Sequence, residues 1–214
     1  MGLKNGDYGE ANVIKTALVN FLLDTNGAEL IINELPFLSC KRAADLAAIK
    51  DGNLIGFEIK SKVDNLRTML AQIADYQKIF NSVYLVYSHK FINSIEIKHI
   101  PKAVGLIMVD DANGLILKRK AISKISLDKS AMISVLWRKD LEKLVKQNRN
   151  LDFEQLKEMV TRQCTIKRIQ KQIAFSLYER YGEGYELLLK EKGQRVIIED
   201  LSYITSTKKH LVAF

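Results

Sequence analysis

The sequence predicts an α/β fold in which a mixed sheet is flanked by helices, followed by a mostly helical, basic C-terminal region. Three observations predict it. The dipeptide Asp51-Gly52 separates two stretches of strand character, and it favours the positive φ angles of a tight hairpin turn. The apolar run at 82–88 is short enough to be a buried parallel strand, and 104–109 is another apolar strand. Other stretches carry apolar residues at helical spacing.

The segment before the hairpin predicts one helix and one strand. Asp7 and Glu10 have the spacing of a capping box, and apolar residues follow at helical intervals, so we expect a helix over 7–24. A strand is expected over 28–35. Pro36 follows directly and indicates that this strand ends at the surface.

The elements after the hairpin are expected to alternate and then become helical. Asp64 can cap a helix that runs to residue 80. The later expectations are a strand at 82–88, a helix at 92–100, strands at 104–109 and 115–118, helices at 131–147, at 152–161 and onward through 181, and a small hairpin within 195–205. We therefore divide the chain into a core, residues 1–125, and a helical basic region, residues 126–214, that could hold nucleic acid.

The hairpin brings two acids together if Asp51 and Gly52 form its loop. Antiparallel pairing then places Asp45 opposite Glu58, with Cβ atoms about 4.5–5.5 Å apart on one face of the sheet. Two bare carboxylates repel at that distance, and a cation between them removes the repulsion. Lys60 follows Glu58 by two residues, so its ammonium lies on the same face.

This trio suits metal-assisted attack on a phosphodiester. Carboxylate oxygens are the ligands that Mg²⁺ prefers, and a lysine can orient or deprotonate an attacking water. Ala47 and Gly56 pair by the same register, and their small size predicts open space beside the charges. The alternative is a solvated salt-bridge network with no catalytic role.

The pattern resembles the PD-(D/E)XK phosphodiesterase superfamily, the restriction-endonuclease-like nucleases. Asp45 matches the Asp of that family, and Glu58 and Lys60 match its (D/E)-x-K motif. Gln72 and Tyr76 match the Gln-x-x-x-Tyr motif of its exonuclease branch. The resemblance implies a core of one helix, a three-strand meander, a helix and a further strand, with these five residues as catalytic or supporting groups.

The resemblance covers roughly residues 6–109, and it departs from the family pattern in two places. Glu10 stands where the exonuclease branch has His, and Ala44 stands where the family has Pro. The resemblance implies that Mg²⁺ or Mn²⁺ is held by Asp45, Glu58 and the carbonyl of Ile59, with Glu10 as a further ligand. Two alternatives stay open: Glu10 caps its helix instead, and Glu34 is a rival third acid.

The composition favours DNA as the partner. The net charge is +8 and the isoelectric point is about 9.3, which suits a polyanion that releases counterions on binding. The chain contains no run of eighteen apolar residues and no signal peptide pattern, so we expect no membrane. Cys40 and Cys164 lack metal-ligand spacing, and this indicates a reduced cytoplasm. The oligomeric state is left open, with a dimer among the options.

The expected function is therefore metal-dependent cleavage of DNA. We see no helix suited to reading bases in the major groove, so phosphate contacts should dominate and sequence preference should be weak. Recognition of an end, a flap or a junction would suit this. Two alternatives are a DNA-binding protein of the same fold that does not cut, and an interaction protein of a phage or defence system.

Overall fold

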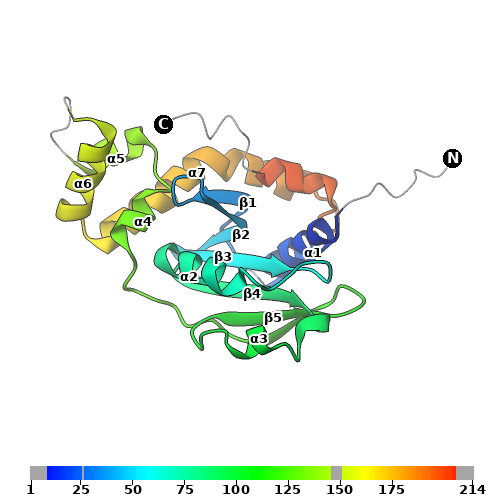
Figure 1. Ribbon diagram of the computed structural model, residues 1–214. Coiled ribbons are helices and arrows are strands. Elements are labelled where there is room, and N and C mark those ends of the chain that lie inside the picture. The colour runs from blue at the N-terminus through cyan, green and yellow to red at the C-terminus, as the bar shows by residue number, and fades with distance from the viewer. Residues whose placement is uncertain (1–8, 26, 146–150, 206–214) are drawn as a thin grey trace.

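The computed structural model describes residues 9–25, 27–145 and 151–205, and it shows an α/β protein built on one mixed sheet (Figure 1). Within these residues six strands follow one another across the sheet in chain order. They are β1 (Leu30–Phe37), β2 (Arg42–Lys50), β3 (Asn53–Lys60), β4 (Ser82–Ser88), β5 (Gly105–Val109) and β6 (Leu115–Arg119). β1 to β3 form an antiparallel meander, β4 and β5 continue parallel to β3, and β6 returns antiparallel. The predicted α/β class with a mixed sheet is confirmed.

Helices cover the sheet and make up the C-terminal part. They are α1 (Glu10–Asp24), α2 (Met69–Ile79), α3 (Ile95–Lys98), α4 (Lys129–Ile133), α5 (Arg138–Leu144), α6 (Phe153–Gln163) and α7 (Ile166–Glu191), with 3₁₀ turns η1 (His89–Phe91) and η2 (Glu199–Ile204). None of the helices in the described ranges is long and apolar enough to cross a membrane.

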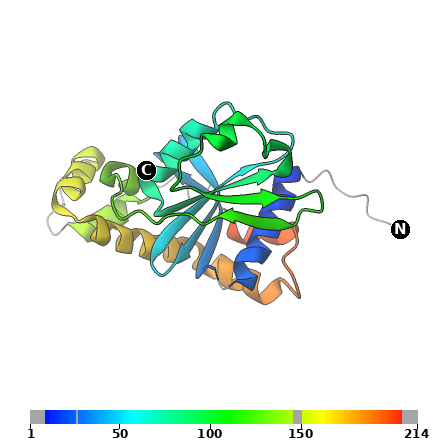
Figure 2. The same ribbon diagram turned by 90° about the horizontal axis from the view of Figure 1, so that it is seen from below.

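The two faces of β3 are covered by different helices, because successive strand residues point to opposite sides. Gly56 faces α2: a Cβ atom there would lie 2.7 Å from the Phe80 ring and 2.8 Å from the Tyr76 ring. Phe57 faces the other side, where it lines an apolar pocket with Phe21 of α1. Figure 2 shows the sheet between the two helices. The expected open space beside Gly56 is therefore absent, since the rings of Tyr76 and Phe80 fill it.

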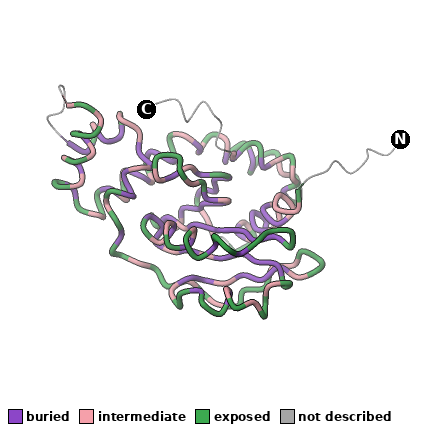
Figure 3. Tube along the Cα trace, viewed as in Figure 1, coloured by how far each residue is buried: buried purple, intermediate pink, exposed green. Residues whose placement is uncertain are grey.

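The C-terminal region packs on the sheet through α7, which runs beside β1 (Figure 1). The Tyr178 hydroxyl donates a hydrogen bond to Glu29 at 3.1 Å, and Asn20 of α1 exchanges two hydrogen bonds with the backbone of Val196. The buried apolar side chains from Ile14 to Ile204 form one continuous cluster, and Figure 3 shows this buried interior. Residues on both sides of the boundary expected at residue 125 contribute to that cluster.

Two expectations for the first elements are wrong. α1 begins at Glu10 with Gly9 as its N-cap and no side-chain cap, so Glu10 is not the third residue of a capping box; Asp7 lies outside the described residues. β1 continues through Pro36, which pairs with Ala43. β1 is the edge strand of the sheet, where a missing N–H is tolerated.

The second helix starts later than expected. The Asp64 carboxylate accepts hydrogen bonds from the backbone nitrogen and hydroxyl of Ser61, at 2.8 and 2.7 Å, and so forms a turn instead of a helix cap. α2 then begins at Met69.

The helix expected over 131–147 is two helices. Helix α5 restarts after Trp137, whose backbone nitrogen donates to the buried Asp140 carboxylate at 3.1 Å. Residues 146 and 147 lie outside the described ranges. The expected C-terminal hairpin is also wrong, because a 3₁₀ turn, η2, occupies 199–204.

Candidate active site

The β2–β3 hairpin has the predicted register. Lys50 pairs with Asn53, and the pairing continues in step to Leu46 opposite Phe57. The turn residues Asp51 and Gly52 have φ angles of 50° and 70°, as the Asp-Gly signal predicts. The regular ladder ends at Leu46 and Phe57, and one further step in the same register would set Asp45 against Glu58.

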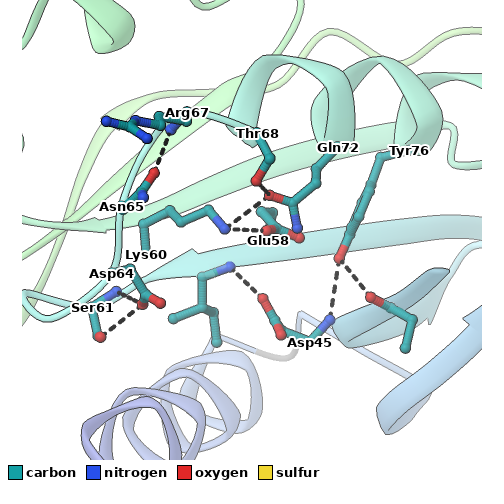
Figure 4. Close-up of polar contacts among 12 residues, drawn as sticks. Asp45, Glu58, Lys60, Ser61, Asp64, Asn65, Arg67, Thr68, Gln72 and Tyr76 are labelled. Atoms are coloured by element: carbon teal, nitrogen blue, oxygen red, sulfur yellow. Dashed lines mark hydrogen bonds and ion pairs between the residues drawn. The ribbon is translucent and has the colours of Figure 1, made fainter.

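Asp45 reaches across to β3 with its side chain. Its Oδ2 atom accepts a hydrogen bond from the backbone nitrogen of Ile59 at 2.7 Å (Figure 4). Burial, and after it the negative charge of Glu58, raises the pKa of Asp45 to about 6. The Glu58 carboxylate is therefore close enough to oppose the ionisation of Asp45.

Glu58, Lys60 and Gln72 form a connected group between β3 and α2. Glu58 is 2% exposed, and the Lys60 ammonium lies 2.7 Å from its Oε1 atom. The same ammonium donates to the Gln72 side-chain oxygen at 3.0 Å, and that oxygen also accepts from the Thr68 hydroxyl at 3.2 Å. Figure 4 shows these side chains pointing toward one another. The structure thus brings together three of the predicted residues.

Tyr76 links α2 to the first residues of β2. Its hydroxyl accepts a hydrogen bond from the backbone nitrogen of Asp45 at 3.2 Å and donates to the carbonyl of Ala43 at 3.4 Å. Its ring packs edge-on against Phe37, with centroids 5.1 Å apart. Burial, and then the negative charges of Glu58 and Asp45, raises the pKa of Tyr76 well above its ordinary value. Tyr76 is a neutral group that fixes the backbone of Asp45.

Glu10 lies beside a different group. Its carboxylate pairs with Lys62 at 3.1 Å and lines a small polar pocket with Ser88 and His89, at the end of β4. Its second oxygen is buried without a hydrogen-bond partner among the described residues. Within the part of the chain that the structure describes, no three His, Cys, Asp or Glu side chains gather as a metal site. Glu10 therefore does not join Asp45 and Glu58 as a third acid in this arrangement.

Sequence reasoning missed Lys15, a buried lysine of α1. Its side chain is 5% exposed, and its ammonium lies 3.0 Å from the Glu34 carboxylate. The positive charge of Lys15 also acts on Asp45, where it partly offsets the effect of burial on the pKa. The available signal was a lysine next to the apolar stripe that contains Ile14 and Leu18.

The oxygen atoms at this position suit a hard divalent ion. Asp45 and Glu58 supply two carboxylates, and Ile59 lies between Glu58 and Lys60 with a carbonyl as a third donor type. Burial, and after it the charge of Glu58, raises the pKa of Asp45, and a cation beside both acids would relieve the second of these effects. The residues therefore fit Mg²⁺ or Mn²⁺ as ligands through two acids and a carbonyl, with water completing the shell.

Comparison with known proteins places this chain in a phage family. The family model described as bacteriophage P4 protein cII matches residues 4–205. The chain belongs to the bacteriophage P4 protein cII family. Protein cII of Enterobacteria phage P4 is 27% identical to it over 210 residues, which cover 92% of this chain and 78% of that protein. The cII match includes the whole sheet, α7 and every candidate site residue from Glu10 to Tyr76.

One solved structure also resembles the chain. A Silicibacter pomeroyi protein of unknown function aligns with a TM-score of 0.44 and 18% identity, over 60% of this chain and 85% of that protein. A likeness of this size carries no argument about function.

Proposed function

We propose that this member of the cII family is a Mg²⁺- or Mn²⁺-dependent deoxyribonuclease of the PD-(D/E)XK type. The observation that carries the proposal is that Asp45 bonds to the backbone of β3 beside Glu58, whose charge acts on it, while Lys60 pairs with Glu58 and donates to Gln72. The element order from α1 through the β1–β3 meander to α2 and β4 supports it, because the PD-(D/E)XK resemblance implies that order.

The proposed roles follow from the contacts. Asp45, Glu58 and the Ile59 carbonyl would hold the ion, which when bound supplies positive charge beside the phosphate and a more acidic water. Lys60 would donate from its ammonium to a phosphate oxygen or orient the attacking water. Gln72 holds that ammonium at 3.0 Å, and Tyr76 fixes the Asp45 backbone at 3.2 Å.

The net charge of +8 supports DNA as the substrate, since phosphate contacts release counterions. The C-terminal region contributes exposed cations, among them Lys167 and Arg168 in the first turn of α7. These are phosphate-type contacts that carry no base information. We therefore propose weak sequence preference, with ends or branched DNA as the preferred substrates.

A second candidate is a DNA-binding protein of the same fold that does not cut. The Glu58–Lys60 pair favours it, because two buried side chains at 2.7 Å form a salt bridge that is complete without a metal. The relation to a phage protein also suits the third option, an interaction protein whose basic region docks on an acidic partner. Neither alternative explains why a second acid, Asp45, lies beside that pair.

Cleavage assays with matched variants test the proposal. Supercoiled, linear and branched DNA are incubated with Mg²⁺ or Mn²⁺ and the wild type, Glu58→Gln, Lys60→Met or Glu183→Gln. The last variant removes one acid from the exposed side of α7 and serves as the control. We expect the wild type and the control to cut, and the two site variants to lose about 100-fold or more in rate.

Two outcomes oppose the proposal. Equal cutting by all four proteins indicates a contaminating nuclease. Retardation of DNA in gels by all four, without cutting, supports the binding protein instead.

A further inference from the structure

Strand β1, which lies next to β2 and its Asp45, contains a glutamate with a strained backbone, Glu34. Asp45 and Glu58 are together called the acid pair. Pairs on both sides of Glu34 keep one register between β1 and β2, and this register places Glu34 opposite Asp45. Glu34 itself has a φ angle of 58°, in the left-handed region, and the pairing is interrupted there. A non-glycine residue in that region costs on the order of 1 kcal/mol or more, and such strain concentrates at functional sites.

The interruption has two local consequences. The Glu34 carboxylate contacts the buried ammonium of Lys15 on α1 at 3.0 Å. The backbone N–H of Asp45 bonds to the Tyr76 hydroxyl at 3.2 Å rather than to β1. The strain in β1 therefore accompanies the placement of two groups beside Asp45.

Three neighbouring strands each carry one acid of this group, and two of the three acids pair with a lysine. Lys15 pairs with Glu34 on β1, and Lys60 pairs with Glu58 on β3. Asp45 on β2 lies between these ion pairs, close enough to feel the charge of both ammonium groups. With all three acids ionised, the three carboxylates and the two ammonium groups together have a net charge of −1. One divalent ion reverses that excess, whereas a second ion would add a large positive surplus.

We propose that Lys15 is a positioning residue that holds Glu34 away from the Asp45–Glu58 pair and limits the centre to one divalent ion. This inference rests on the proposed function, because it assumes that the acid pair binds a metal. The Glu34 side chain is 54% exposed, and its contact with the buried Lys15 ammonium is the ion pair that the structure gives it. Without the lysine, the site would hold a further free carboxylate and one positive charge fewer.

Two variants of this pair should change metal affinity in opposite directions. Lys15→Met keeps the length and the buried apolar character of the side chain, but it removes the charge and releases Glu34. Glu34→Gln leaves the Lys15 ammonium without its carboxylate, so that it competes with the ion for Asp45. A purely structural salt bridge would lower stability in both variants and leave metal affinity unchanged.

Isothermal titration calorimetry measures the affinity for Mn²⁺ and the number of ions bound per chain. The full-length wild type, Lys15→Met, Glu34→Gln and the double variant are each titrated with MnCl₂ in metal-free buffer. We expect one Mn²⁺ per wild-type chain. Lys15→Met should bind Mn²⁺ about tenfold more tightly or take a second ion, and Glu34→Gln should bind it about tenfold more weakly. The double variant should return to near the wild-type affinity. Lys15→Met leaves a carboxylate that is 54% exposed, so it gives a result even if Glu34→Gln is destabilised by the buried ammonium that it leaves unpaired.

The outcomes separate the two proposals. If the wild type binds Mn²⁺ and neither single variant changes affinity or stoichiometry, the role of Lys15 is overturned and the proposed function stands. If the wild type binds no Mn²⁺, the metal site and the role of Lys15 are overturned together.

Discussion

Asp45 and Ile59 are joined across the β2–β3 hairpin by a hydrogen bond of 2.7 Å, in which a carboxylate oxygen accepts the backbone N–H. This bond lies beyond the last pair of the regular ladder, Leu46 and Phe57. The Asp45 side chain thus continues the contact between the two strands, and the charge of Glu58 acts on its carboxylate. The arrangement is unfavourable for a bare acid, because burial and Glu58 both oppose its ionisation.

Replacing Asp45 should stabilise the protein at neutral pH. The pKa of Asp45 is raised from 3.8 to about 6 in the folded state, so the folded protein binds more protons between these values and stability falls as the pH rises through them. The cost of ionising Asp45 is on the order of 3 kcal/mol. Asp45→Asn removes it but weakens the bond to Ile59, so we expect a gain of about 1–2 kcal/mol at pH 7.5 and none at pH 4.

Urea unfolding of both proteins at the two pH values measures this difference. An Asp45→Asn variant that is equally destabilised at pH 4 and pH 7.5 would contradict the assigned environment of the carboxylate.

Removing one partner of the Glu58–Lys60 pair should lower the free energy of unfolding more than replacing both partners. The two side chains are 3% and 9% exposed, so Lys60→Met leaves a buried carboxylate beside Asp45 without its partner. We expect a loss of about 3 kcal/mol in the free energy of unfolding. Glu58→Gln combined with Lys60→Met should recover at least half of that loss. Denaturant titration of the single and double variants gives the coupling, and strict additivity would exclude a direct pair.

The Tyr76 hydroxyl should contribute through the Asp45 backbone. Tyr76→Phe keeps the ring against Phe37 and removes the acceptor for the Asp45 N–H and the donor to the Ala43 carbonyl. We expect a loss of about 1–2 kcal/mol in stability. Wild-type Tyr76 should also remain neutral beyond pH 10, since its pKa is raised. Absorbance titration of wild type against Tyr76→Phe tests this, and loss of an ordinary tyrosine step in the variant would count against it.

Gly56 should tolerate no larger side chain. A Cβ atom at Gly56 would lie 2.7 Å from Phe80 and 2.8 Å from Tyr76, so both rings must move. We expect Gly56→Ala to destabilise the protein by about 1–3 kcal/mol through overpacking. Gly182 in α7 is the matched control, because a methyl group there would meet no neighbouring atom within 4 Å outside its own stretch of helix. Gly182→Ala should stabilise the helix by about 0.5–1 kcal/mol. Equal thermal shifts in the two variants would contradict this packing.

The sequence determined the register of the hairpin because a single local signal controls it. Asp51 and Gly52 adopt the positive φ angles of the predicted turn, and every pair up to Leu46–Phe57 follows from that turn. Gln72 and Tyr76 were named by the resemblance to the exonuclease branch, and their four-residue spacing predicted that they share one flank of α2, from which both reach the hairpin. Local chemistry was sufficient for the hairpin, whereas the choice of site residues came from the family resemblance.

The remaining features depend on tertiary contacts that no local pattern encodes. Asp64 satisfies Ser61 instead of capping a helix, and Asp140 restarts a helix where periodicity predicted continuity. Lys15 was missed because its partner, Glu34, lies 19 residues away in the sequence and on another element. The space over Gly56 was misjudged because Tyr76 and Phe80 come from a later helix.

The most direct test of the acid pair as a divalent-ion site is the anomalous scattering of a crystal soaked in MnCl₂. We predict a manganese peak between the carboxylates of Asp45 and Glu58, within ligand distance of both, that is lost in Glu58→Gln crystals. A soaked wild-type crystal with no peak there, or with manganese bound only beside Glu10, would contradict the account.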